Sequence, residues 1–532
     1  MPISRFFRAA VIGLRTSSAA LFLVAAIATN AAALLPSQPQ ILSDMVLVNN
    51  YFMNEWGSTP GCNTCLPGSH PSTIWTRGTY FEGALALYRI NQDPNIYNYA
   101  VAWGSFPNWG LRYGDTDTNA DSQCAAQSYI ELYQFDTTQT NRLTHPITNA
   151  DFWCNSSKVG WGYVDALHMS MPMFAKLTAI TGSTNYPGKM YSWFHLAKSV
   201  YGASNGLYNL TDHLWWRDAT FLSNYKAQDD TTQKCYWSRG NGWAFAALAR
   251  SMDVLPTNDA HFPEYLQTFR DMAGALRAVQ RADGFWNVNL AYTNDYPGPE
   301  TTGTALFTYG MAWGLNHGYL DTNLFLPTVI NGWNALATGA LHHSTNADNG
   351  FLGYVQSTGS KPADGQPVTY TSIPNFDDYG LGVFLLAGSQ VYALNAKWTF
   401  TAFQNEYFTP AELANPSVSG PGADPDGDGL NNLEEYAFGL NPRQTDARSF
   451  SPSGAISNGH LTLTFIRRHD VADLAYIPEA SSDLNDWNSG SVFTQEISVV
   501  PLDAQRDLVT VQDLTPVSGI SPHFLRLRLQ TN

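Results

Sequence analysis

The chain has 532 residues, of which 44% are hydrophobic and 13% aromatic, and its formal net charge at pH 7 is −16. This length exceeds what one hydrophobic core usually needs, so we expect two or more domains, and the composition excludes a disordered chain. The negative charge argues against nucleic acid as a partner, because phosphate binding needs a basic face.

The first 33 residues have the pattern of a secretory signal peptide. Arg5, Arg8 and Arg15 precede an apolar run over residues 19–27, and alanines occupy residues 31–33. This order of charged, apolar and small residues directs export and is then removed. The run is too short for a permanent membrane span, and we find no later span in the sequence. We therefore expect a soluble, exported protein that is periplasmic, cell-surface or secreted.

Five cysteines occur, and an exported protein can form disulfides from some of them. Cys62 and Cys65 are close together, whereas Cys124, Cys154 and Cys235 are isolated in the sequence. The odd number leaves at least one thiol unpaired. For Cys62 and Cys65, a local disulfide in a surface loop is favoured over a zinc site.

Residues 34–397 are predicted to form a helical domain. Apolar residues recur at three- and four-residue spacing, and polar loops rich in Gly, Asn, Asp and Pro separate the periodic segments. The clear helices are predicted at residues 74–90, 121–135, 165–180, 189–200, 243–254, 262–279, 301–315, 324–341 and 379–394, with weaker ones at 41–52 and 97–103.

Residues able to do chemistry occur at the starts of alternate helices. They are Trp75 with Arg77, Asp121, Asp165, Arg239 with Asn241, Glu300, and Asp377 with Asp378. Six helical hairpins in a ring would bring these starts to one end of a barrel, where helix dipoles and free N–H groups favour an anionic ligand. A lone aspartate at a helix start is more often an N-cap, so it is the alternation that indicates a site.

The most distinctive stretch is Trp237-Ser238-Arg239-Gly240-Asn241-Gly242-Trp243. An arginine fork binds a carboxylate in bidentate fashion, and the flat indoles beside it suit the face of a sugar ring. The two glycines allow a tight turn. The stretch predicts a binding loop for a cyclic anion, and the alternative is a packed helix start with a structural arginine.

Residues 398–446 are predicted to be a linker, rich in Pro, Ser and Gly, that contains a calcium loop. Residues 424–435 have the spacing of an EF-hand-type loop, with glycine at the sixth position. The expected ligands are Asp424, Asp426, Asp428, Asn432 and Glu435 through their side chains and Leu430 through its carbonyl. We expect a structural Ca²⁺, and the alternative is an acidic turn without metal.

Residues 447–532 are predicted to form a small β-sandwich. Apolar and polar positions alternate at residues 461–465, 507–511 and 524–529, with turn signals between such runs. We find no catalytic cluster there. The module is therefore expected to serve attachment to a surface, sorting, or contact with carbohydrate.

The helical part resembles the unsaturated uronyl hydrolases of glycoside hydrolase family 105, such as the unsaturated rhamnogalacturonyl hydrolases, and of the related family 88. The resemblance covers about residues 45–395. It is carried by residues 237–243, by Val164-Asp165-Ala166-Leu167-His168-Met169 and by Glu300-Thr301-Thr302-Gly303-Thr304-Ala305, with support from residues 379–389. It implies a mainly α fold, an (α/α)6 six-hairpin barrel, followed here by the small all-β domain.

The resemblance also implies an activity. Such enzymes remove the 4,5-unsaturated uronic acid from the non-reducing end of oligosaccharides that lyases release from pectin, rhamnogalacturonan, ulvan or similar glycans. An acid protonates C4 of the vinyl ether, water adds at C5, and the hemiketal collapses. By resemblance, Asp165 is the general acid that also activates the water, and Asp121 is the second acid. Residues matched to substrate binding are Trp237, Arg239, Asn241, Trp243 and Glu300. No cofactor is implied for catalysis, and the expected partner is an acidic oligosaccharide.

This chemistry needs a carboxylic acid that stays protonated near the working pH. A helix N-terminus lowers the pKa of a carboxyl group, whereas burial, the like charge of Asp121 and the substrate's own carboxylate would raise the pKa of Asp165. We expect the raising effects to prevail in the bound complex.

The sequence departs from the family where many members have a histidine after a Leu-Tyr pair, because this chain has Asn209 there. His213 and Arg217 follow in a different cluster, and either could take over the substrate contact. Alternatively, the tryptophans of this cluster pack and its charges cap a loop. His168, one turn into the helix that Asp165 begins, is either structural or lines the pocket.

Two other functions remain open. A conventional glycosidase on the same barrel would use Asp121 and Asp165 as its carboxylate pair, but a neutral sugar would leave Arg239 without an anionic partner. A non-catalytic protein that binds acidic glycans would fit the signal peptide, the calcium loop and the β-module. The intact pair of acids argues against that second alternative.

Overall fold

The computed structural model describes residues 35–56, 72–158, 160–201, 206–223, 225–376, 378–395, 399–445, 451–468, 471, 473–502, 506–517 and 522–531. The predicted signal peptide and the pair Cys62 and Cys65 lie outside these residues. Cys124, Cys154 and Cys235 lie within them and are free thiols. None of the helices in the described part of the chain combines the length and the apolar content that a membrane span requires.

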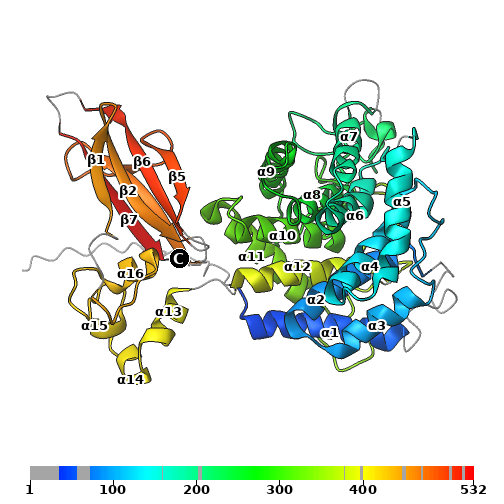
Figure 1. Ribbon diagram of the computed structural model, residues 1–532, viewed down its shortest axis with the longest axis horizontal. Helices are drawn as coiled ribbons and strands as arrows, with labels where there is room; N and C mark the ends of the chain where they lie inside the picture. The colour runs from blue at the N-terminus through cyan, green and yellow to red at the C-terminus, as the bar shows by residue number, and fades with distance from the viewer. Residues whose placement is uncertain are drawn as a thin grey trace, which may run out of the picture. The chain divides into compact units, whose positions relative to one another are not determined.

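Helices α1 to α12 alternate between an outer and an inner ring (Figure 1). The inner helices are α2 (Trp75–Asn91), α4 (Cys124–Phe135), α6 (Asp165–Thr181), α8 (Ser238–Met252), α10 (Thr301–Asn316) and α12 (Tyr379–Asn395). The outer helices are α1 (Gln38–Trp56), α3 (Pro94–Ser105), α5 (Thr144–Asn155), α7 (Asn185–Ser199), α9 (Phe262–Ala278) and α11 (Thr322–Asn334). Each inner helix contacts the next, and α12 contacts α2, so the ring closes. The predicted six-hairpin barrel is confirmed.

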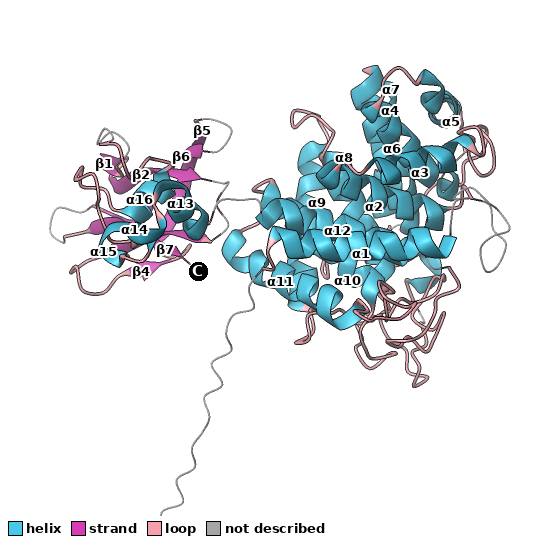
Figure 2. Ribbon diagram, turned by 90° about the horizontal axis from the view of Figure 1, so that it is seen from below, coloured by secondary structure: helices cyan, strands magenta, loops and turns pink. Residues whose placement is uncertain are grey.

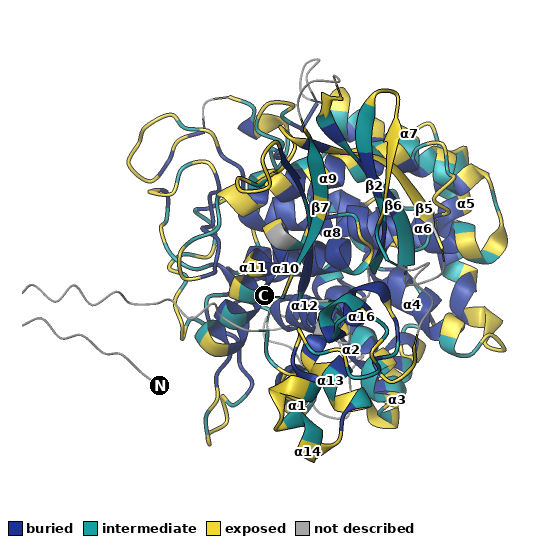
Figure 3. Ribbon diagram, turned by 90° about the vertical axis from the view of Figure 1, so that its left-hand side faces the viewer, coloured by how far each residue is buried: buried dark blue, intermediate teal, exposed yellow. Residues whose placement is uncertain are grey.

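The two rings differ in how their residues are buried, and the sequence explains why. Every residue of α8 is buried, as is nearly all of α10, and Figure 3 shows both in the colour of buried residues. A helix that is buried all round belongs inside a large core. Outer helix α9 instead buries one stripe, which includes Tyr265, Phe269, Met272 and Leu276 at three- and four-residue spacing.

The two glycines of the tryptophan–arginine stretch have a different role from the one expected. The predicted tight turn is wrong, because Gly240 and Gly242 lie inside α8 and take no positive φ. A Cβ on Gly242 would lie 2.8 Å from the side chain of Leu306 in α10. From the other side, a Cβ on Gly303 would lie 2.3 Å from Ser238 Oγ. The small residues therefore allow α8 and α10 to approach closely.

Other element boundaries also differ from the prediction. Asp121 lies in a short 3-10 turn, η1 (Ala120–Ser122), and α4 begins after it at Cys124. Helix α5 was not predicted, because it is short and buries few apolar residues. The long helix expected over residues 324–341 divides into α11 and a π-helix, η4 (Ala335–Ala340). Figure 2 shows long loops between the barrel helices, and several of these precede inner helices.

The described residues of the C-terminal part form four short helices and two antiparallel sheets. The helices are α13 (Phe400–Tyr407), α14 (Pro410–Leu413), α15 (Pro416–Ser419) and α16 (Asn432–Phe438). The strands are β1 (Ser453–Ser457), β2 (His460–Arg468), β3 (Leu474–Ser481), β4 (Asn488–Ser489), β5 (Thr494–Pro501), β6 (Arg506–Pro516) and β7 (Phe524–Thr531). They form sheets of order β1-β2-β6-β5 and β4-β3-β7.

Two apolar clusters hold this part together. Phe465 and Val509 of one sheet pack against Leu527 of the other, as in a sandwich. Phe403 and Tyr436 from the short helices share a second cluster with strand residues such as Ile466. The region read from its composition as a linker is therefore folded over residues 399–445 and packs with strands of the β-module.

Candidate active site

Side chains from the starts of inner helices meet at one end of the barrel. The Trp75 ring of α2 lies edge-on to the Trp243 ring of α8, with centroids 6.0 Å apart, and 5.2 Å from the Tyr379 ring of α12. Arg77 Nε donates to Asp378 Oδ2 at 3.4 Å, and both side chains are buried. Asp377 lies outside the described residues. These contacts join α2, α8 and α12 as the alternating pattern indicated.

Asp165 and Asp121 are interacting carboxyl groups. Asp165 is the first residue of α6, and burial raises its pKa above the ordinary value. Burial also raises the pKa of Asp121, and the negative charge of Asp165 raises it further. The Tyr163 hydroxyl donates to Asp121 Oδ1 at 3.1 Å. For Asp165, burial thus outweighs the nearby arginines and the backbone hydrogen bond, which lower its pKa, and the pair suits proton transfer to a substrate.

Arg217 contacts the acid of α6 directly. Its Nε donates to Asp165 Oδ2 at 3.1 Å, and its Nη1 donates to Asp218 Oδ2 at 2.7 Å. The guanidinium lies 4.9 Å from the Tyr163 ring centroid, and the Val164 N–H donates to the Arg217 carbonyl at 2.8 Å. The side chain stays 24% exposed, so a substrate anion can reach it.

His213, the other candidate of this cluster, has a different neighbour. Its Nδ1 lies 3.4 Å from the Tyr208 hydroxyl, and its φ of 57° is left-handed. The described contacts therefore link Arg217, and not His213, to the acid pair.

Arg239 is held by backbone carbonyls. Its Nη1 donates to the Gln356 carbonyl at 2.6 Å and its Nη2 to the Ser357 carbonyl at 2.8 Å. Its guanidinium also lies 4.6 Å from the Trp237 ring and 5.2 Å from the Tyr379 ring. The side chain is 1% exposed, and its positive charge lowers the pKa of Asp165. Arg239 is therefore a fixed cation near the acid, with part of its fork already used by the backbone.

Asn241 and Glu300 have partners within the protein. Asn241 Oδ1 accepts from the Trp215 N–H at 2.7 Å, and its Nδ2 donates to the Trp215 carbonyl at 2.9 Å and to the Trp237 carbonyl at 3.0 Å. Glu300 caps α10 through the N–H groups of residues 302 and 303 and accepts from Ser238 Oγ at 3.1 Å. Both side chains are buried, and each makes these hydrogen bonds within the protein.

The two indoles of the tryptophan–arginine stretch are also buried. Trp237 Nε1 donates to Gln356 Oε1 at 2.9 Å, and the Trp243 ring lies 4.6 Å from the His168 ring. His168 Nε2 lies 2.9 Å from Glu82 Oε2, and both of these side chains are 0% exposed. His168 is therefore structural. Trp75, which is only partly buried, is the indole of this group that can present a face to a sugar.

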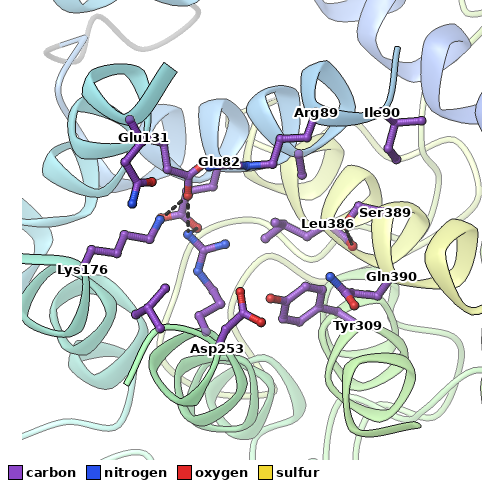
Figure 4. Close-up of a pocket in the computed structure, with 14 residues that line it drawn as sticks. Glu82, Arg89, Ile90, Glu131, Lys176, Asp253, Tyr309, Leu386, Ser389 and Gln390 are labelled. Atoms are coloured by element: carbon purple, nitrogen blue, oxygen red, sulfur yellow. Dashed lines mark hydrogen bonds and ion pairs between the residues drawn. The ribbon is translucent and has the colours of Figure 1, made fainter. Parts of the chain in front are cut away.

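A charged cavity of about 560 Å³ is lined by residues from the middle and the C-terminal halves of inner helices and by the residues just after α8 (Figure 4). Lys176 and Glu131 form an ion pair there, and Arg250 Nη2 lies 3.5 Å from both Glu82 and Glu131. The acids and bases in this group compensate each other. The cavity thus lies toward the C-terminal ends of the inner helices, away from the helix starts that carry Asp165.

The predicted calcium loop brings its first three acids together. The carboxylates of Asp424, Asp426 and Asp428 have oxygens within 4.8 Å of one another. The N–H groups of Gly427 and Gly429, whose φ values are 77° and 96°, donate to the Asp424 carboxylate. The remaining expected ligands follow directly, with Leu430, Asn432 and Glu435 buried. Hard oxygen ligands in this order fit Ca²⁺.

Sequence reasoning missed Tyr163 and Gln356. Tyr163 precedes the aspartate of α6 by two residues, and its role depends on the pairing of its strand-like segment with Asp218. Gln356 is 0% exposed and lies in a loop without periodicity, yet it binds both Trp237 and, through its carbonyl, Arg239. Neither residue carries a local sequence signal that could have revealed it.

A closed ring of six helical hairpins, with paired carboxyl groups and arginines at the helix starts, defines the chain as a six-hairpin glycosidase. Residues 45–395 match the family model described as Glycosyl Hydrolase Family 88, and the chain belongs to this family.

Known proteins that resemble the chain agree with this assignment. An unsaturated 3S-rhamnoglycuronyl hydrolase of Formosa agariphila is 29% identical over 340 residues, which cover 60% of this chain and 85% of that protein. A solved glycosyl hydrolase family 88 protein from Bacteroides vulgatus is 30% identical, with a TM-score of 0.58, and covers 67% of this chain and 99% of its own. A solved structure described as a polysaccharide lyase is 28% identical, with a TM-score of 0.58, and covers 67% of this chain and 97% of its own.

Proposed function

We propose that the protein hydrolyses lyase-generated oligosaccharides by removing the 4,5-unsaturated uronic acid from their non-reducing end. The observation that carries this proposal is the environment of Asp165. Its carboxyl group has a pKa raised by burial and adjoins both a second acid and an accessible arginine. A protonated acid beside a cation suits an anionic, electron-rich vinyl ether.

The residues divide the reaction between them. Asp165 gives its proton to C4 of the vinyl ether, and charge then develops toward C5 and the ring oxygen. The Asp165 carboxylate so formed, next to Asp121, accepts a proton from the water that adds to C5. The hemiketal then opens and releases the sugar and a keto-uronic acid. Arg217 and Arg239 hold the substrate carboxylate or stabilise it from a distance.

Binding of substrate also affects the acid. A substrate carboxylate that approaches Arg217 competes with Asp165 for the Nε–H group, which weakens the interaction that lowers the pKa of Asp165. The bound acid is then more readily protonated than the free acid.

The experiment follows the ultraviolet absorbance of the conjugated unsaturated uronate in lyase digests of ulvan and rhamnogalacturonan. Hydration destroys the conjugation, so we expect the absorbance to fall with time. Asp165→Asn should abolish the fall, while Asp271→Asn, a half-buried residue on outer helix α9, should not change it.

The sign of the absorbance change separates the alternatives. An increase in absorbance on intact polysaccharide would indicate a lyase. One similar solved structure is described as a polysaccharide lyase. A constant absorbance with reducing sugar released from neutral glycans would favour a conventional glycosidase. Binding of acidic glycans without any turnover would favour a non-catalytic role.

Three further features belong to this proposal. The pattern of residues 1–33 supports export, the loop at 424–435 supports a structural Ca²⁺ site, and the C-terminal β-module supports attachment to a surface or contact with glycan. Secretion is tested by fractionating cells that express the full chain. Removal of Ca²⁺ tests the loop.

A further inference from the structure

The segment between η4 and α12 contains a compact loop, residues 356–366, that closes around one buried side chain. Gln356 is 0% exposed, and its Nε2 donates to the carbonyls of Lys361, Pro362 and Asp364 at 3.0, 3.2 and 2.7 Å. Backbone carbonyls only accept hydrogen bonds, so the side chain at this position has to donate. The loop therefore takes its shape from the Gln356 amide.

The other polar atoms of Gln356 contact three inner-helix starts. Its Oε1 accepts from Trp237 Nε1 at 2.9 Å, and its carbonyl accepts from Arg239 Nη1 at 2.6 Å. The same carbonyl accepts from the Tyr379 hydroxyl at the start of α12. The Gln356 N–H donates to Oε1 of Glu300, the N-cap of α10, at 3.4 Å. One loop residue thus joins the starts of α8, α10 and α12.

The loop also sets the orientation of Arg239. The adjacent carbonyls of Gln356 and Ser357 each accept from one of its two terminal nitrogens. A guanidinium has five N–H donors, so each terminal nitrogen keeps a second N–H. The Nε of Arg239 is buried and makes no hydrogen bond with any residue that the structure describes. The positions of the two loop carbonyls therefore decide how the remaining donors are oriented.

We propose that Gln356 is a positioning residue for substrate binding, which fixes the loop carbonyls that orient Arg239 toward the carboxylate of the unsaturated ring. This inference rests on the proposed function, in which Arg239 acts on that carboxylate. The carboxylate is present in the bound substrate and in the transition state alike. A loss of its contact with Arg239 therefore raises KM more than it lowers kcat.

The second cation of the site is held by other residues. Arg217 is bonded to Asp165 and Asp218, and its carbonyl accepts from the Val164 N–H. A change in the loop at residues 356–366 therefore displaces Arg239, while Asp165 keeps its neighbouring arginine. For this reason we expect binding to suffer while the proton-transfer step is largely retained.

The test measures kcat and KM of Gln356→Met on an unsaturated disaccharide and on the methyl ester of its uronic acid. KM for the free acid should rise roughly 10- to 100-fold, with kcat within about three-fold, because a charge-assisted contact is lost. KM for the ester, which offers Arg239 no carboxylate, should change by no more than about two-fold. Gln280→Met removes an amide that donates to the carbonyls of Gly284 and Thr328, and this matched control should change neither KM.

A double-mutant cycle shows whether Gln356 acts through Arg239. In an Arg239→Gln background, Gln356→Met should raise KM for the free acid by no more than about two-fold. A merely structural role would add its full effect to that of Arg239→Gln and would impair both substrates.

A milder variant covers the case in which Gln356→Met does not fold. In Gly359→Ala, the new Cβ would lie 2.4 Å from the Cβ of Asp364, so the loop must shift although the Gln356 amide is intact. Gly359 is exposed, which limits the effect of the substitution on the core. Gly359→Ala should raise KM for the free acid more than KM for the ester.

Equal losses on the acid and the ester, an unchanged KM for the acid, or full additivity with Arg239→Gln would overturn the inference. Failure of the proposed function is distinguishable, because the wild type would then turn over neither substrate. In that case, calorimetry compares the binding of the acid and the ester to the wild type and to Gln356→Met. Weaker binding of the acid alone in Gln356→Met supports the positioning role, and any other result overturns it.

Discussion

Nε of Arg217 lies 3.1 Å from Oδ2 of Asp165, so the proposed general acid shares its carboxylate with a neighbouring cation. Arg217 is also bound to Asp218 on its other side. The pKa of Asp165 therefore reflects burial, which raises it, against two arginines, which lower it.

Replacing Arg217 should shift the pH profile of the enzyme. Loss of the positive charge in Arg217→Gln raises the pKa of Asp165 further, and a general acid works below its pKa. The alkaline limb of kcat/KM against pH should therefore move to higher pH, by about one unit or more, while KM rises. Arg217→Lys keeps the charge and should shift the limb less. An alkaline limb that stays in place in Arg217→Gln would show that another group sets it.

Alanine substitutions at two helical glycines, Gly242 and Gly274, should change the stability of the protein in opposite directions. In Gly242→Ala the new Cβ would lie 2.8 Å from Leu306, so α8 and α10 must separate, at about 1–3 kcal/mol. Gly274, on the exposed side of α9, has open space around it, and Gly274→Ala should stabilise the protein by about 0.5–1 kcal/mol. Denaturant unfolding of both variants checks the signs. Equal effects would contradict close packing at Gly242.

Glu82 should contribute to stability at neutral pH and lose that contribution in acid. Burial alone would raise its pKa, but Arg250 and His168 lower it from 4.5 to about 2. Because folding lowers the pKa of Glu82, its ionised carboxylate stabilises the folded state above about pH 4.5. This contribution, about 3 kcal/mol, disappears as the pH falls toward 2. In Glu82→Gln, the unfolding free energy should fall less steeply between pH 5 and 2. Glu55→Gln, on the exposed side of α1, should keep the wild-type slope, and a wild-type slope in Glu82→Gln would refute the assignment.

Calcium should stabilise the C-terminal part specifically. At 100 times its dissociation constant, a ligand adds about 2.7 kcal/mol to stability. Scanning calorimetry should therefore show one unfolding transition whose midpoint temperature is higher with excess Ca²⁺ than with EDTA. Asp426→Asn should remove the difference, and Mg²⁺ should not reproduce it. Identical traces with Ca²⁺ and EDTA would exclude a Ca²⁺ site of useful affinity in this loop.

Much of the fold could be predicted because its signals are local. The helical period gave the inner helices, and the polar helix starts gave their common end, which Trp75, Trp243 and Tyr379 confirm by contact. The alternation of apolar and polar residues predicted β2, β6 and β7, but it did not predict β1, β3, β4 or β5. Helix α5 was not predicted because its buried positions, Pro146, Asn149, Ala150 and Trp153, have helical spacing but include only one large apolar side chain.

The roles of individual side chains were harder to predict, because they depend on contacts across the barrel. Asn241 could face a sugar or the Trp215 backbone, and its residue type is the same in either case. Glu300 likewise serves as an N-cap whose second oxygen meets Ser238.

The pair formed by Arg77 and Asp378 has a consequence for how the protein is made. These residues are 301 positions apart in sequence, yet they join the first inner helix to the last. A growing chain on the ribosome cannot complete its central wall until α12 has emerged. Any product that stops short of α12 exposes the apolar inner side of α2 and α10 to water and becomes a target for chaperones or proteases. The cell therefore obtains either a whole barrel or none.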